Sequence, residues 1–226
     1  TVIFMAIFLI IDLAFFSANI LKIPDGGWFP ILIGSVIFIL MTTWKKGRAI
    51  LYKILKGEAI EINSFITSMG TNPPPRVEGT AIFLTPNPDG VPHALLHNLK
   101  HNKVIHEKVI ILTVMFMDYP HSLTKDLVTV EKLPHNFYKV TVKYGFKDEP
   151  DLPKDLALHA KNGINIDPMN SSYFIGKEIL LATPKENMNY WRKKLFIGLF
   201  RSAETITNQF KLPPNRVVEL GSQVLF

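Results

Sequence analysis

Two long apolar runs at the start of the chain constrain its fold more than any other feature. The first extends from Val2 to Ile20, a length that matches one bilayer crossing of about 20 residues. The second extends from Trp28 to Trp44, and tryptophan at both ends suits the two lipid–water interfaces. The connection at residues 21–27 holds a proline and a pair of glycines, which favours a tight reversal. We therefore predict two membrane-spanning helices.

Basic residues are distributed unevenly around the second run. Lys22 is the only basic residue of the connection, whereas a basic group follows the run: Lys45, Lys46, Arg48, Lys53 and Lys56. Because lysine and arginine accumulate on the cytoplasmic side of membrane proteins, we expect a multi-pass protein of the cell (inner) membrane with its C-terminal domain in the cytoplasm. The chain enters an apolar run at once, without the pattern of a signal peptide, so we also expect further membrane helices before it.

Composition argues against several classes of protein. Hydrophobic residues make up 47% of the 226 residues, and the excess lies in the two apolar runs. The net charge is +6, but basic residues form no run of five or more, which argues against a nucleic-acid partner and fits weak attraction to an anionic membrane surface. The chain has no cysteine, which excludes disulfides and thiolate metal ligands.

The segment after the apolar runs divides the sequence into three parts. Basic and apolar residues alternate from Lys45 to Thr71, a pattern typical of a helix that lies along a membrane face. Prolines at 73–75 then end any helix and favour an extended spacer. We predict membrane helices in residues 1–47, a juxtamembrane linker in 48–77 and a cytoplasmic α/β domain in 78–226.

The predicted domain is organised around a strand–helix–strand unit. An apolar, β-favouring run at Thr80–Thr85 is followed by turn-forming residues 86–90, a helix near Pro92–Asn102 and a second apolar run at Val109–Met117. Neither run alternates cleanly with polar residues. We therefore expect both strands to be inner strands, buried on both faces.

Further elements extend this unit to a mixed sheet flanked by helices, so the fold class is α/β. The pattern predicts an antiparallel hairpin, a short helix ended by Gly163, another strand, a long helix and a final edge strand. The predicted limits are Leu127–Lys132, Phe137–Tyr144, Leu152–Asn162, Tyr173–Ala182, Met188–Lys211 and Val217–Leu220. The apolar stripe of the long helix predicts that it covers the sheet, with contact to the membrane as the alternative.

Three stretches carry a resemblance to a known family. They read GTAIFLTPNPDGVPHALLHNLKHNKVIHEKVIILTV from Gly79, IDLAFFSANILKIPDGGWFPILIG from Ile11 and PPNRVVELGSQV from Pro213. Together they resemble the KUP/HAK/KT family of potassium-uptake transporters in its bacterial, low-affinity form. The similarity covers essentially the whole chain.

The resemblance implies the C-terminal part of a twelve-helix transporter, so the two spans would be its last two and the N-terminal transmembrane helices would be missing here. It implies potassium uptake by K+/H+ symport, with K+ and H+ as transported ions, no cofactor, and the K+ site in the missing helices. The implied partners are the lipid bilayer and the missing helices. The cytoplasmic domain would regulate gating or support assembly of a homodimer.

Asp12 and Asn19 are the candidate site residues within the first span. An ionised carboxylate in hydrocarbon costs several kcal/mol, so such residues usually face a bundle interior or a water-filled path. Helical spacing places the two residues on one face, two turns apart. One interpretation is a group that takes part in proton-coupled transport. The other is a packing carboxylate paired with a residue on a missing helix.

Three histidines with a four-residue spacing, His93, His97 and His101, suggest a zinc site. Eight residues of helix rise about 12 Å, so the three cannot share one ion, because ligand nitrogens lie about 2 Å from zinc. A pair would lack an evident third ligand. We therefore predict a polar helix flank of hydrogen-bonded histidines and no metal site.

The turn at residues 85–90 lies between a strand and a helix, where open α/β sheets often bind ligands. It lacks the glycine-rich phosphate-binding motifs, Pro86 and Pro88 donate no N–H, and Asp89 repels anions. We therefore predict no cofactor-binding residue. A membrane-tethered nucleotide-sensing module is the alternative function.

The sequence also lacks the common catalytic motifs, GxSxG and HExxH among them. Asp118, His121 and Asp126 are close in sequence and could be combined into an acid–base site, but loops commonly collect such residues. We predict no catalytic residues and no enzyme activity.

Overall fold

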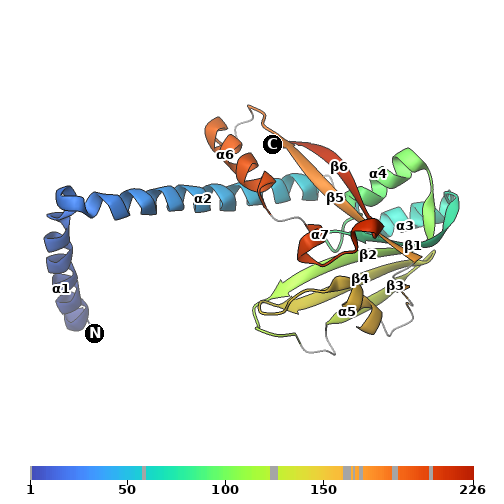
Figure 1. Ribbon diagram of the computed structural model, residues 1–226, viewed down its shortest axis with the longest axis horizontal. Helices are drawn as coiled ribbons and strands as arrows, with labels where there is room; N and C mark the ends of the chain where they lie inside the picture. Colours follow the sequence, from blue (N-terminus) through green and yellow to red (C-terminus); the bar gives the residue numbers. More distant parts are fainter. Residues whose placement is uncertain are drawn as a thin grey trace. The chain divides into compact units, whose positions relative to one another are not determined.

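The computed structural model describes residues 2–57, 60–122, 127–159, 164, 166–167, 170–184, 188–203 and 206–226 (Figure 1). It consists of two compact units, residues 1–49 and residues 50–226. The first is called here the helical unit and the second the α/β unit. The predicted limits at residues 47 and 77 stay predictions.

The helical unit contains α1 (Val2–Ile20), a short π-helical turn (Ile23–Gly27) and the first part of α2 (Trp28–Gly57). The turn depends on its two glycines. Gly26 has a φ of 118°, which side chains rarely adopt. A Cβ at Gly27 would lie 2.9 Å from the carbonyl oxygen of Lys22. The connection between the two apolar runs is therefore built from backbone that favours glycine at both positions.

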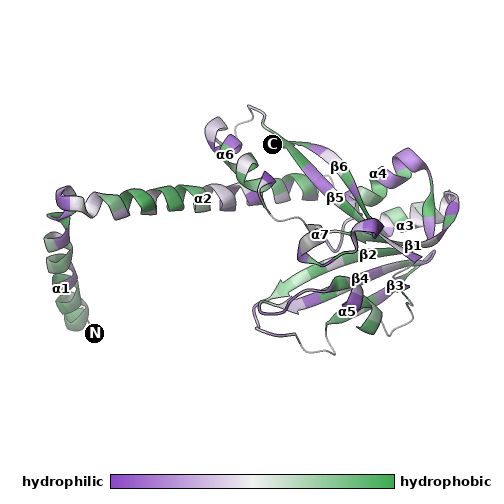
Figure 2. Ribbon diagram, in the orientation of Figure 1, coloured by the Kyte–Doolittle hydropathy of each residue, from purple (hydrophilic) through white to green (hydrophobic). Residues whose placement is uncertain are grey.

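Both helices of this unit are long and apolar enough to cross a membrane, and the hydropathy colouring shows this along α1 and much of α2 (Figure 2). Three of their hydroxyl groups are satisfied within the helix. Ser17, Ser35 and Thr42 donate to the carbonyl oxygens of Leu13, Ile31 and Phe38, one turn earlier. Internal hydrogen bonding of this kind is what a hydrocarbon environment demands.

The α/β unit is built on a six-stranded sheet with the order β3-β4-β2-β1-β5-β6. The strands are β1 (Arg76–Leu84), β2 (Ile105–Met117), β3 (Val128–Leu133), β4 (Phe137–Gly145), β5 (Ser171–Leu181) and β6 (Val217–Leu225). All neighbours are parallel except β3, which forms an antiparallel hairpin with β4. The predicted mixed sheet and hairpin are thus confirmed.

Helices cover both faces of the sheet centre, because alternate residues of β1 and β2 point to opposite sides. Ala81, Phe83 and Ile111 pack with α3 (Ile62–Thr71) and α4 (His93–Asn102). Ile82, Ile110 and Leu112 pack on the other face with α5 (Leu152–His159). The expectation that both strands are buried on both faces is therefore confirmed.

A third cluster lies where β5 and β6 extend past the end of β1. Leu180 of β5 and Val224 of β6 pack there with Phe226, with Leu51 of α2, and with Phe196 and Ile197 of α6 (Tyr190–Arg201). The last two turns of α2 are thus part of the core of the α/β unit. α3 is likewise buried in the core, whereas the sequence predicts that this segment belongs to a linker.

The predicted long helix at 188–211 is wrong. α6 ends at Arg201, and a separate short helix, α7, covers Ile206–Gln209. Phe196 belongs to the cluster beside α2, whereas Phe210 packs with α5 on the sheet. One straight helix could not place both side chains, so the apolar stripe is divided between two cores. Gly163, predicted to end α5, lies outside the described residues.

Candidate functional site

The turn after β1 is held by its own polar side chains. The backbone N–H of Asn87 donates to the hydroxyl of Thr85 over 3.2 Å, and the N–H of Asp89 donates to the side-chain oxygen of Asn87 over 3.2 Å. Such local bonds fix a turn without a regular element. The N–H of Val91 donates to the carbonyl of Ile60 over 2.8 Å, which joins the turn to the segment before α3.

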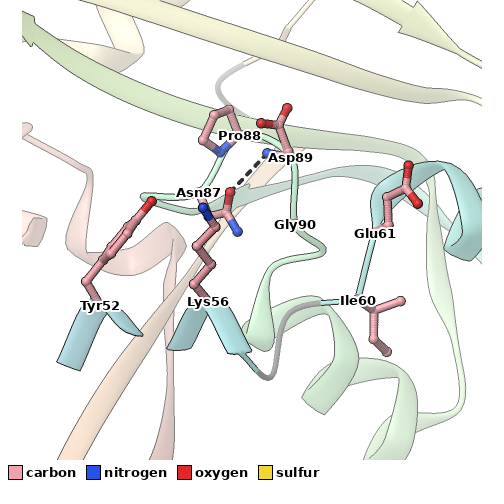
Figure 3. A pocket seen from close by; sticks show the side chains of 8 residues that line it. All are labelled: Tyr52, Lys56, Ile60, Glu61, Asn87, Pro88, Asp89 and Gly90. Carbon is pink, nitrogen blue, oxygen red and sulfur yellow. Dashed lines mark hydrogen bonds between the residues drawn. The ribbon is translucent and has the colours of Figure 1, made fainter. Parts of the chain in front are cut away.

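This turn forms one wall of a cavity of about 330 Å³ (Figure 3). The cavity is lined by the end of α2, the segment before α3 and the turn itself: Tyr52, Lys56, Ile60, Glu61, Asn87, Pro88, Asp89 and Gly90. Figure 3 shows the Lys56 side chain extending toward Asn87. The ammonium of Lys56 also lies 6.0 Å from the centre of the Tyr52 ring.

The cavity lies at a favourable place in the fold. β1 connects through α4 to β2 on one side, whereas the chain later returns to β5 on the other side of β1. In open α/β sheets, ligands often bind beyond the carboxyl ends of strands where the connections reverse direction in this way. The turn after β1 is therefore the candidate ligand site of the α/β unit.

The chemistry of this site does not resemble a phosphate cradle. The N–H groups of Asn87 and Asp89 are already bonded within the turn, and prolines occupy the positions before each of them. Asp89 and Glu61 add negative charge. Asp89 is itself paired with Lys139 over 3.0 Å, although its side chain is 83% exposed. The turn therefore offers few free N–H donors to a phosphate group. The expectation of no cofactor-binding residue stays a prediction.

The second cavity of the α/β unit, of about 360 Å³, contains an arginine whose role is structural. The guanidinium of Arg76 donates to the carbonyl oxygens of His106, Glu107 and His135, at 3.1, 2.8 and 2.7 Å. His135 and Asn136 both have positive φ in the hairpin turn, which is costly for residues with side chains. Arg76 therefore stabilises the β3–β4 turn.

The three histidines of α4 are placed as the helical spacing predicts. The rings of His97 and His101 lie 5.7 Å apart, and Nε2 of His93 is buried without a hydrogen-bond partner. Within the described part of the chain, no group of three or more histidine, aspartate and glutamate residues could hold a metal ion. The polar-flank interpretation stays a prediction.

His121 has a partner that the sequence does not indicate. Its Nδ1 lies 2.8 Å from one carboxylate oxygen of Asp148, and the other oxygen accepts the N–H groups of Ser122 and Gly145, at 2.9 and 2.8 Å. The N–H of Ser122, followed by the contact with His121, holds the pKa of Asp148 below its usual value. This group joins the segment after β2 to the end of β4. Asp126 lies outside the described residues.

Two buried tyrosines provide neutral polar groups on the α5 face of the sheet. The hydroxyl of Tyr144 donates to Asp155 over 2.6 Å, and burial raises the pKa of Tyr144. Burial, followed by the negative charge of Asp151, raises the pKa of Tyr173 to about 12. Both tyrosines are protonated at neutral pH. Tyr144 acts as a donor to Asp155, whereas the buried hydroxyl of Tyr173 has no hydrogen-bond partner among the described residues.

Asp12 and Asn19 lie on α1, seven residues apart, which places them on one side of the helix. Both are exposed within the helical unit. The backbone carbonyl of Asn19 accepts the N–H of Lys22 at the start of the reversal. The two proposed roles of Asp12, transport and packing, both stay predictions.

The features described so far define a class of protein: a membrane chain whose apolar helices are followed by an α/β domain. Comparison with known proteins gives the family. Residues 1–49 match the model of the K+ potassium transporter integral membrane domain, and residues 78–226 match that of the K+ potassium transporter C-terminal domain. The chain belongs to this family of potassium transporters.

Curated relatives agree with the family models. The chain is 52% identical to the probable potassium transport system protein Kup 1 of Dechloromonas aromatica, over 97% of this chain and 35% of that protein. It is 52% identical to the corresponding Kup protein of Azoarcus sp., over 99% and 35%, and 47% identical to that of Myxococcus xanthus, over 97% and 34%. The chain thus spans about a third of the length of these relatives. No solved structure matches it.

Proposed function

We propose that this chain forms the last two spans and the C-terminal domain of a transporter that imports K+, with the α/β unit on the cytoplasmic side of the inner membrane. The observation that carries the proposal is the order of the two family matches. The integral membrane model covers the two apolar runs, and the C-terminal domain model covers nearly all of the sheet and its helices from α4 onward. The basic residues after α2 support the cytoplasmic side.

The transported ions are K+ and H+, and the chain needs no resident cofactor. The K+ site is expected in helices that precede this chain in the whole transporter. The helices α1 and α2 then complete the bundle, with apolar side chains facing lipid and neighbouring helices. Polar residues such as Asp12 would face the interior of that bundle.

The α/β unit regulates the spans or supports their assembly. α2 is a continuous helix from Trp28 to Gly57, and its last turns are built into the core of the α/β unit through Leu51, which is 3% exposed. A movement of the second span along or about its axis would therefore strain that core. This continuity is the physical basis for a regulatory link.

The transport proposal is tested with the full-length gene in a host that lacks its own potassium uptake. Growth at limiting K+ should be restored by the full-length gene and lost when residues 1–49 are deleted. A version that keeps the spans but lacks residues 58–226 measures the contribution of the α/β unit. Failure of the full-length gene to restore K+ uptake, although the protein is present in the membrane, would contradict the proposal.

Asp12 is the residue through which we propose a link to protons. In the full-length transporter, Asp12→Asn should lower K+ uptake and flatten its dependence on external pH, because the amide cannot exchange a proton. Asn19→Ala, on the same face of α1, is the matched control for packing. If Asp12→Asn leaves both the uptake rate and its pH dependence unchanged, Asp12 has a packing role only.

A further inference from the structure

The positive charge of this chain is concentrated in two short stretches. Residues 45–57 contain five basic residues and no acidic one, and α6 contains four basic residues and no acidic one. The remaining 16 basic and 19 acidic residues leave the rest of the chain with a net charge of −3. The overall charge of +6 is therefore a property of the end of α2 and of α6.

These two stretches are in contact within the α/β unit. Leu51 of α2 packs with Phe196 and Ile197 of α6, which are 0% and 8% exposed. α6 is also fixed by Lys193, which is only 2% exposed and donates to the carbonyl of Thr183 over 2.9 Å. The orientation of α6 about its own axis is thus determined by one apolar face and one buried lysine.

The exposed face of α6 combines aromatic and basic residues. Tyr190 and Trp191 are 52% and 54% exposed, and the ammonium of Lys194 lies 4.8 Å from the centre of the Tyr190 ring. Arg201, the last residue of α6, is also exposed. Among the residues that the structure describes, neither Lys194 nor Arg201 forms an ion pair.

We propose that this face of α6 rests on the anionic lipid headgroups at the cytoplasmic surface of the membrane. The proposal depends on the membrane placement proposed above. Exposed tryptophan and tyrosine beside lysine and arginine, without an acidic residue, are what a helix at a lipid interface presents. Phosphate headgroups would supply a negative charge for Lys194 and Arg201, which have no ion-pair partner among the described residues.

α6 packs on a segment that closely follows the second apolar run in the sequence, which favours lipid over another protein as the partner of α6. α6 packs on Leu51, which follows Trp44 at the end of the second apolar run by only seven residues of the same helix. Seven residues of helix rise about 10 Å. Along the chain, the basic end of α2 that α6 contacts therefore follows directly after the second apolar run. Anionic headgroups attract basic segments that follow a span in this way.

The experiment uses the full-length protein in vesicles of phosphatidylcholine and phosphatidylglycerol whose acyl chains carry bromine near the headgroup, which quenches nearby tryptophan. Within this chain, variants keep a single tryptophan, Trp28, Trp44 or Trp191, with the others replaced by phenylalanine. Any tryptophan in the preceding part of the transporter is replaced likewise. A reference variant carries Phe146→Trp instead, because Phe146 is 61% exposed at the end of β4.

We expect quenching of Trp28, Trp44 and Trp191, and little quenching of the tryptophan at 146. Lys194→Gln with Arg201→Gln should reduce the quenching of Trp191 about twofold or more, as should high salt. The control variant, Lys100→Gln with Lys103→Gln at the end of α4, removes two positive charges at another place in the α/β unit. It should leave the quenching of Trp191 unchanged. Quenching of Trp191 should be stronger in anionic than in purely zwitterionic vesicles.

The outcomes separate this proposal from the one on which it rests. If Trp28 and Trp44 are quenched but Trp191 is quenched no more than the tryptophan at 146, the contact of α6 is wrong and the membrane placement stands. If Trp28 and Trp44 are not quenched, the membrane placement itself is wrong. If Trp191 escapes the lipid quencher but is also shielded from dissolved iodide, another protein surface covers this face and the lipid proposal fails.

Discussion

The helical unit and the α/β unit use the same apolar residue types in opposite ways. In the helical unit, Ile10 and Phe38 are 67% and 68% exposed. In the α/β unit, Ile110 and Phe137 are completely buried. Burial of apolar surface drives folding in water, so apolar side chains left exposed along α1 and the first part of α2 indicate a different solvent. The comparison shows that the two units are adapted to lipid and to water, respectively.

Hydrogen bonding follows the same division. In the helical unit, the hydroxyl groups of Ser17, Ser35 and Thr42 donate to carbonyl oxygens of their own helix. In the α/β unit, polar groups join distant segments, such as Asp148 with Ser122 and Arg76 with His135. Tertiary hydrogen bonds position loops in water, whereas a lone span must satisfy its own backbone and hydroxyls.

The largest effect that tests this comparison comes from one substitution made in both units. Ile110→Ala should destabilise the α/β unit by about 2–5 kcal/mol, because it leaves a cavity between β2 and α5. Ile37→Ala in α2, where the side chain is 49% exposed, should cost less than about 1 kcal/mol in detergent, because no protein core is disturbed.

The measurement is guanidinium unfolding of the full-length protein in a mild detergent, followed by tryptophan fluorescence. Trp191 is the only tryptophan of the α/β unit. Replacing every other tryptophan of the protein with phenylalanine therefore makes the fluorescence report the unfolding of that unit. Equal losses of stability of the α/β unit in the two variants would contradict the view that Ile37 lies outside the core of that unit.

A second, smaller effect concerns the way the segment after β2 is held. A Cβ at Gly145 would lie 2.6 Å from the carbonyl carbon of Pro120 and 2.7 Å from Cα of His121, so backbone would have to move. Gly145→Ala should destabilise the α/β unit by about 1–3 kcal/mol. Gly176→Ala in β5 is the matched control, since its nearest neighbour is a flexible glutamate side chain at 4.0 Å. The same unfolding assay applies, and equal behaviour of the two alanines would refute the packing argument.

The smallest predicted effect is a change in pH dependence. The pKa of Asp148 is lower in the folded protein than in the unfolded chain. Its carboxylate therefore stabilises the fold above the unfolded pKa of about 4, and this contribution is lost as the pH falls through the folded value. Asp148→Asn should remove part of the loss of stability between pH 6 and pH 3, as measured by unfolding at each pH. An unchanged slope in Asp148→Asn would assign the acid sensitivity to other carboxylates.

The sequence by itself determined the features that depend on local pattern. The lengths of the apolar runs, the two glycines of the reversal, the buried strands β1 and β2 and the β3–β4 hairpin are all readable from residue order. The same holds for the family resemblance, which the family models confirm. Periodicity and turn chemistry act over a few residues, so they are visible before folding.

Only the tertiary structure decided which distant residues meet. It divided the apolar stripe of residues 188–211 between two cores, buried α3 beside β1, and paired His121 with Asp148 from another loop. It also placed the basic end of α2 against the basic helix α6, although more than 130 residues separate them in the chain. Such contacts arise because parallel strands bring remote segments together, and no local pattern records which segments those are.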